Sequence, residues 1–249
     1  MTDFASFDGT SLAYRELGDG RPIILLHGLF SSGEMNWHRY GAAAEIAGAG
    51  YRVITPDHRG HGASAAPHDP AAYPSDVLAM DVEALVAHLG LTDFDLGGYS
   101  LGARTAVRCL ARGMTPGRCV LGGMGLSGIV GSAARAEFFL KVIAQPDGWP
   151  PGSAEYFTAA FMKQNGIDTA AVGHVLRAQL ATPREVLKTL ATPTLVVCGR
   201  DDQDNGSAAD LALTLPNAAL AEIPGNHMSA VTKADFGSAI AAWLQHHSS

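Results

Sequence analysis

The run Gly98-Tyr99-Ser100-Leu101-Gly102 is the segment whose residue types point most directly to chemistry. It places a serine close to glycines, directly after the apolar residues of an expected strand. A sharp turn from strand to helix would hold the serine hydroxyl away from the backbone, and only small residues at Gly98 and Gly102 avoid clashes there. A phosphate-binding loop fits poorly, because the glycine spacing is wrong and no lysine follows. Ser100 is therefore a candidate nucleophile.

A serine nucleophile needs a general base and a group that orients this base. The candidate base is His227, in a turn after the strand-like residues 218–223. The candidate acid is Asp202, just past the apolar run 194–199. Asp201 and Asp204 stay open as replacements for Asp202, because at most one of the three carboxylates should orient the imidazole.

When a serine attacks a carbonyl group, the carbonyl oxygen becomes an oxyanion, which needs two hydrogen-bond donors. The apolar residues 22–26 lead into His27-Gly28-Leu29-Phe30, a loop that can point a backbone N–H into a cleft. We expect the N–H groups of Leu29 and Leu101 to form the oxyanion hole. His246 and His247 are weaker candidates for the base, since they lie near the end of the chain, where a side chain is poorly held.

Strand-like and helical runs alternate along the chain, as in parallel sheets with crossover helices. The first strand looks antiparallel and exposed. Two capping boxes, Thr232 with Asp235 and Thr182 with Glu185, predict helix starts. The expected strands are 10–17, 22–27, 51–56, 94–98, 118–124, 194–199 and 218–223, and the expected helices lie near 37–49, 74–89, 100–112, 207–215 and 232–245.

The order of these motifs resembles the α/β-hydrolase superfamily over nearly the whole chain. The resemblance rests on the following motifs: the His-Gly loop at 27–30, the segment 56–64, the serine turn at 98–102 (the elbow), the Gly-x-x-Asp turn at 199–202, and His227. The sequence of the His-Gly-Leu-Phe loop is most similar to that of small bacterial serine carboxylesterases. The resemblance implies an α/β-hydrolase fold, with a mostly parallel eight-stranded sheet flanked by helices. It also implies a helical lid inserted before the strand that carries the acid. Residues 126–190 break the alternation of strands and helices and are the expected lid, which leaves 1–125 and 191–249 as the core.

The lid region has helical periodicity and many aromatic side chains, and Ser153 is a plausible helix cap there. Tyr99 stands where many relatives carry His or Gln, which leaves substrate preference open. In a minor alternative, the carboxylate of Glu34 approaches the cleft and favours a substrate with a cationic group. We expect an apolar substrate pocket lined by Phe30, Tyr99, Phe138, Phe139, Phe157, Phe161 and Met228.

Composition limits the function classes. A formal charge of −7 over 249 residues disfavours nucleic acid and anionic membranes as partners. The three cysteines, Cys109, Cys119 and Cys198, lie in apolar runs, which predicts buried free thiols in a reducing compartment. With no secretory signal or membrane span expected, the prediction is a cytoplasmic protein. Its oligomeric state is left open.

No cofactor and no metal ion are expected. His58 and His61 have a spacing that suggests a metal site, but only Asp57 accompanies them. His27 is expected to be a hydrogen-bonding residue of its own loop rather than a base.

These residues predict a serine hydrolase that cleaves carboxylic esters of small, largely apolar molecules through an acyl-enzyme. The same groups could also serve a carbon-carbon bond hydrolase, a lactonase, a thioesterase or a perhydrolase. A hydrolase-like receptor that binds a small molecule without turnover is the alternative of another class.

Overall fold

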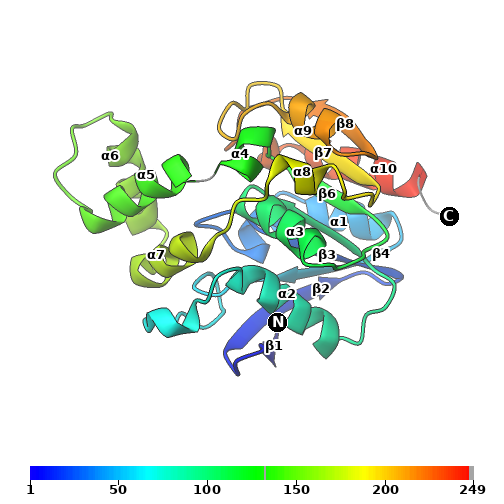
Figure 1. The fold of residues 1–249 in the computed structure, drawn as a ribbon, viewed down its shortest axis with the longest axis horizontal. Coiled ribbons are helices and arrows are strands. Elements are labelled where there is room, and N and C mark those ends of the chain that lie inside the picture. Colours follow the sequence, from blue (N-terminus) through cyan, green and yellow to red (C-terminus); the bar gives the residue numbers. More distant parts are fainter. Residues whose placement is uncertain (132, 247–249) are drawn as a thin grey trace.

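The computed structural model describes residues 1–131 and 133–246, and its centre is an eight-stranded sheet (Figure 1). The strands follow the order β1-β2-β4-β3-β5-β6-β7-β8. The pairs β1–β2 and β2–β4 are antiparallel, and all the other neighbouring strands are parallel. The strands are β1 (Thr2–Ala5), β2 (Ser11–Leu17), β3 (Arg21–Leu26), β4 (Tyr51–Pro56), β5 (Asp95–Tyr99), β6 (Cys119–Gly122), β7 (Thr194–Gly199) and β8 (Ala218–Ile223).

Helices cover both faces of the sheet, so the central strands are apolar on both sides. In β3, Ile24 and Leu26 pack toward the α2 and α3 side, whereas Ile23 and Leu25 pack toward α1 and α10. This alternation follows from the two-residue period of a strand. The helices around the sheet are α1 (Ala42–Gly48), α2 (Val77–His88), α3 (Leu101–Ala111), α9 (Ala208–Thr214) and α10 (Ala234–His246).

The chain between β6 and β7 is helical, and its described residues contain no strand. Figure 1 shows α5, α6 and α7 extending away from the sheet. Ser153 caps α6, accepting a hydrogen bond from the Tyr156 N–H at 3.1 Å, as predicted. That this insertion acts as a lid, and that the chain divides at 125 and 191, stay predictions. The helices are α4 (Leu126–Val130), α5 (Ala133–Ala144), α6 (Ala154–Gln164), α7 (Thr169–Ala178) and α8 (Arg184–Leu187).

The strand predictions need two corrections. The sequence missed β1, because this four-residue strand buries only Phe4 and shows no alternating pattern. The first expected strand, 10–17, corresponds to β2, and the prediction that it is exposed was wrong because β1 was not foreseen. β1 covers the edge of β2, and Leu12 and Tyr14 are buried in the core.

The helix predictions were wrong in detail at three places. Residues 37–49 do not form one helix: a π-helical turn, η1 (Glu34–His38), is separated from α1 by Gly41 at φ 87°. Thr232 does not cap α10, since it ends a 3₁₀ turn, η3 (Ala230–Thr232), and donates to the Ser229 carbonyl. Thr182 does not cap α8 either, because its buried hydroxyl accepts a hydrogen bond from Arg108.

The remaining 3₁₀ turn, η2 (Pro70–Ala72), lies between β4 and α2. The three cysteines are buried and free, as expected. Among the helices of the described residues, none combines the length and the apolar character needed to cross a bilayer.

Candidate active site

The turn between β5 and α3 holds Ser100 in an unusual backbone conformation, with φ 53° and ψ −109°. This is costly for a residue with a Cβ, and it persists here because the surroundings fix it. The Ser100 N–H donates to the Gly122 carbonyl at 2.8 Å. A Cβ at Gly98 would overlap the backbone of Gly102, and one at Gly102 would overlap the Leu26 carbonyl. The small residues of the motif are therefore required by packing.

Three side chains far apart in sequence meet at this turn. His227 Nε2 lies 3.0 Å from Ser100 Oγ, and His227 Nδ1 lies 2.9 Å from Asp202 Oδ2. Because an ionised carboxylate only accepts hydrogen bonds, Nδ1 carries the ring proton. Nε2 is then free to accept the hydroxyl proton of Ser100. This arrangement can activate a serine as a nucleophile.

The carboxylate of Asp202 is buried but well partnered. Its burial raises the pKa, but the hydrogen bond and charge of His227 outweigh this effect, so the pKa of Asp202 lies below its usual range. The Asp204 N–H donates to Oδ1 at 3.1 Å, and the Cys198 thiol donates to Oδ2 at 3.6 Å. Burial, together with the neighbouring Asp202, raises the pKa of Cys198 to about 12, which keeps the thiol a donor. Asp202 is therefore held as an anion facing His227.

The structure places the alternative residues elsewhere. Asp201 is exposed, and Asp204 forms an ion pair with Arg135 at 3.0 Å. His246 is the exposed last residue of α10, and His247 lies outside the described residues. Only Asp202 of the three aspartates contacts the imidazole.

Tyr99 fixes the loop that carries His227. Its hydroxyl donates to the His227 carbonyl at 2.5 Å, and its ring lies 5.4 Å from the imidazole, centroid to centroid. The ring also packs against Phe236 of α10, in a T-shaped pair. The residue before the serine thus also positions the histidine.

The two expected oxyanion donors border the same cavity as Ser100. Leu101 is the first residue of α3, so its N–H has no acceptor within the helix. The loop at Leu29 is shaped by Phe30, which adopts φ 59°, and by Asn36, whose Oδ1 accepts the Gly28 N–H at 2.9 Å. These two amide groups can therefore serve as paired donors.

A cavity of about 610 Å³ opens over Ser100 and His227. Its wall is mostly aromatic and aliphatic, which suits an apolar ligand. Of the expected pocket residues, Phe157 is 62% exposed and Met228 is 64% exposed, so these two lie at its open side. All seven expected residues border it, namely Phe30, Tyr99, Phe138, Phe139, Phe157, Phe161 and Met228.

Two other groups of residues lie apart from the cavity. Glu34 is directed to Arg15, with 3.4 Å between the charged atoms, and does not border the cavity, so the cationic-substrate alternative was wrong. His27 holds its own loop, as predicted: Nδ1 lies 2.7 Å from the Gly28 carbonyl, and Nε2 accepts the His58 N–H at 2.9 Å. The rings of His58 and His61 pack near it, and no cluster of possible metal ligands occurs among the described residues.

Among the polar residues that border the cavity and were not predicted from the sequence are Asn36, Arg104, Arg135 and Gln179. The position of Arg104 in the sequence could have predicted that it borders the cavity. It lies four residues after Ser100, one turn into the following helix, where a side chain can reach the same cavity. The other three come from distant segments and carried no signal of this kind.

Known proteins are similar in sequence to most of this chain. A family model described as "alpha/beta hydrolase fold" matches residues 21–119, which include the elbow but not Asp202 or His227. A non-heme haloperoxidase from Rhodococcus erythropolis is 30% identical over 263 aligned positions, covering 92% of this chain and 93% of that protein. A putative non-heme chloroperoxidase from Synechocystis is 38% identical over 99 residues, which cover 40% of this chain but only 34% of that protein.

Solved structures share the fold over nearly the full length. An esterase from Exiguobacterium antarcticum superposes with a TM-score of 0.79 at 19% identity, covering 98% of this chain and 99% of that one. An esterase from Rhodococcus sp. ECU1013 gives a TM-score of 0.71 at 26% identity, covering 98% and 97%. Because a relative of nearly equal length and this sheet architecture agree, the chain belongs to the α/β-hydrolase family.

Proposed function

We propose that the protein is a serine esterase that cleaves small carboxylic esters through a covalent acyl-enzyme. The observation that carries this proposal is the continuous hydrogen-bonded path from Asp202 through His227 to Ser100, opening into a mostly apolar cavity.

In the first half of the reaction, Ser100 Oγ bonds to the ester carbonyl carbon while its proton passes to His227 Nε2. The carbonyl oxygen becomes an oxyanion and accepts hydrogen bonds from the N–H groups of Leu29 and Leu101. The carbon–oxygen bond to the alcohol then breaks, and the leaving oxygen takes the proton from His227.

In the second half, water attacks the acyl carbon and gives a proton to His227. The bond to Ser100 Oγ breaks, Oγ recovers a proton, and the carboxylic acid leaves. Asp202 keeps the imidazole in the required tautomer and stabilises its charged form at both stages.

The test is hydrolysis of simple alkyl esters, followed by acid release at constant pH, together with labelling by a fluorophosphonate probe. We expect wild-type protein to be labelled stoichiometrically at Ser100, and Ser100→Ala to lower turnover by roughly 10⁴-fold or more. Turnover that survives in folded Ser100→Ala protein would refute the proposal. A folded wild-type protein that is inert to the probe would favour the non-catalytic receptor.

Perhydrolysis is the second candidate, because the relative aligned over nearly the full length is named a non-heme haloperoxidase. In that reaction hydrogen peroxide replaces water in the attack on the acyl-enzyme and releases a peracid. Peracid formation from acetate and peroxide, dependent on Ser100, is the measurement that detects it. The expected partner is a small-molecule ester, and a cytoplasmic location without nucleic-acid or membrane partners stays a prediction.

A further inference from the structure

A buried arginine that the proposed reaction does not use borders the large cavity. Arg104 belongs to the first turn of α3, and its N–H donates to the Ser100 carbonyl at 3.0 Å. The residue is only 7% exposed, and it borders the same cavity as Ser100 and His227. The backbone positions of Arg104 and Ser100 are therefore about one helical turn apart, or ~6 Å along the axis of α3 for four residues.

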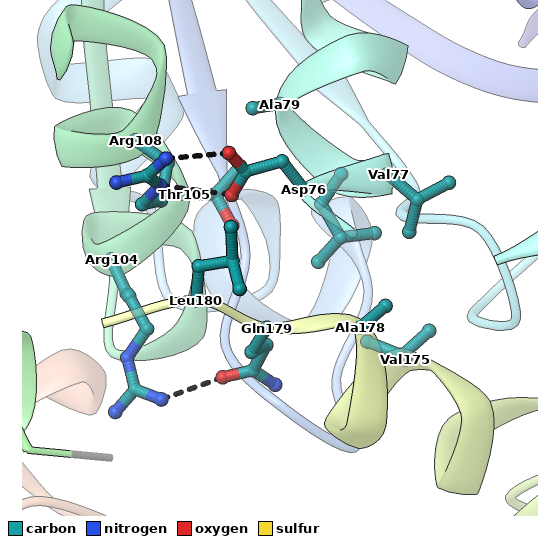
Figure 2. A pocket seen from close by; sticks show the side chains of 11 residues that line it. Asp76, Val77, Ala79, Arg104, Thr105, Arg108, Val175, Ala178, Gln179 and Leu180 are labelled. Carbon is teal, nitrogen blue, oxygen red and sulfur yellow. Dashed lines mark hydrogen bonds and ion pairs between the residues drawn. The ribbon is translucent and has the colours of Figure 1, made fainter. Parts of the chain in front are cut away.

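Arg104 differs from the other buried arginines, because no acid among the described residues forms an ion pair with it. Figure 2 shows Arg108, one turn further along α3, paired with both oxygens of Asp76, while Arg104 points to the neutral Gln179. Arg104 donates to Gln179 Oε1 at 2.6 Å, and its buried Nε has no partner among the described residues. The two comparable buried residues do have acids: Arg59 pairs with Asp8 and Asp81, and Arg118 pairs with Asp95.

The charge of Arg104 is not balanced by its neighbours. Burial and the nearby Arg135 lower the pKa of Arg104 to about 10, so it remains a cation at neutral pH. Arg135 itself is engaged by Asp204 at 3.0 Å and lies over the Phe139 ring. The cavity thus holds one positive charge more than its described wall residues neutralise. A buried charge without a partner is destabilising, which favours a ligand that supplies the missing anion.

We propose that the substrate is an ester that also carries a carboxylate, and that Arg104 binds this carboxylate together with the amide group of Gln179. The proposal rests on the serine esterase function and narrows its substrate class. An arginine and a carboxylate pair through two parallel hydrogen bonds, and the contact with Gln179 uses only Nη1 of Arg104. The short separation along α3 favours a carboxylate a few carbon atoms away from the ester carbonyl. A half-ester of a short dicarboxylic acid fits this spacing.

The kinetic test compares monoethyl glutarate with ethyl 5-methylhexanoate, in which a neutral isopropyl group replaces the carboxylate. We expect kcat/KM of wild-type protein to favour the anionic ester by about 10- to 100-fold. Arg104→Gln should abolish this ratio, and Arg104→Lys should retain part of it. The matched control is Arg112→Gln, which removes one exposed charge at the end of the same helix and should leave the ratio unchanged.

A second pair of esters covers a carboxylate on the alcohol side. It compares 4-acetoxybenzoate with the neutral 4-acetoxytoluene in the same proteins. A preference that depends on Arg104 in either pair supports the proposal and says which side of the ester faces the arginine. Equal kcat/KM within both pairs would overturn it.

A binding measurement separates this inference from the esterase proposal, because it needs no turnover. Millimolar glutarate should raise the melting temperature of Ser100→Ala protein and have no such effect on the double variant Ser100→Ala/Arg104→Gln. Ester hydrolysis with neither a thermal shift nor an anionic preference would refute the carboxylate site alone. A thermal shift without hydrolysis of any ester would refute the esterase and leave the carboxylate site standing.

Discussion

The loop that we expect to supply one oxyanion donor depends on a buried histidine that must stay neutral, and this makes stability sensitive to acid. His27 is fully buried; Nδ1 faces the Gly28 carbonyl, and Nε2 accepts the His58 N–H. A proton on Nε2 would remove that acceptor and place a charge in a fully buried site. Burial, with a smaller effect from His61, lowers the pKa of His27 from 6.5 to about 3.

The size of the effect follows from this shift. The unfolded chain takes up a proton near pH 6.5, while folded His27 stays neutral until near pH 3, so acid favours unfolding. The stabilisation is complete above pH 6.5 and is lost as the pH falls toward 3. Between pH 7.0 and 5.5, His27 alone should cost about 1.3 kcal/mol of unfolding free energy. Burial also lowers the pKa of His58 and of His61, and both act in the same direction.

The assay is urea unfolding of wild-type protein and of His27→Gln at pH 7.0 and 5.5. Glutamine can donate to Gly28 and accept from His58 without titrating, so the variant should lose about 1.3 kcal/mol less than wild type over this interval. His246→Gln, at the exposed end of α10, is the matched control and should behave like wild type. Identical losses in wild type and His27→Gln would refute the reasoning, whatever the carboxylates contribute to both.

Three further substitutions test the geometry of the site. Asp202→Asn should lower kcat by about 10⁴-fold in an ester assay, because the amide favours the wrong imidazole tautomer, whereas Asp201→Asn should not; equal losses would contradict the assignment. Gly102→Ala should destabilise the fold by about 3 kcal/mol or more, since the methyl group overlaps the Leu26 carbonyl; an unchanged urea midpoint would count against the packing argument. Tyr99→Phe should cost about 1 to 3 kcal/mol, because it leaves the buried His227 carbonyl without its donor, and an undiminished stability would show that water replaces the hydroxyl.

Local patterns in the sequence were enough to predict most of the sheet and the order of the site residues. The runs before Ser100 and Asp202 are apolar because parallel strands are buried on both faces, so their ends could be placed within one or two residues. The small residues at Gly98 and Gly102 identified the strand-to-helix turn, and the structure shows why a larger residue is excluded there. The seven expected wall residues border the cavity because aromatic residues gather in the inserted helices and in the loops beside Ser100.

The features that the sequence did not predict depend on contacts between distant segments. β1 is held by pairing with β2, which a four-residue segment with a single buried side chain does not show in its own pattern. The expected cap at Thr182 failed because Arg108, from another helix, donates to its hydroxyl. The Gly-x-x-Asp turn favoured Asp202 in the sequence, but Asp201 follows the same strand and was set aside only by the burial of Asp202 against His227.

Arg104 illustrates the same limit and its functional consequence. In the sequence, Arg104 and Arg108 look alike, because they lie four residues apart on one helix. The difference lies in their partners: the Asp76 backbone, in a left-handed conformation at φ 64°, turns its carboxylate to Arg108, whereas no acid in the described part of the chain pairs with Arg104. A fold selected for stability alone would gain by replacing an unpaired buried cation with an apolar residue. A buried guanidinium without an acidic partner near the serine is therefore best explained by a ligand of opposite charge. The ion pair formed in the bound state offsets the free energy of burying the cation.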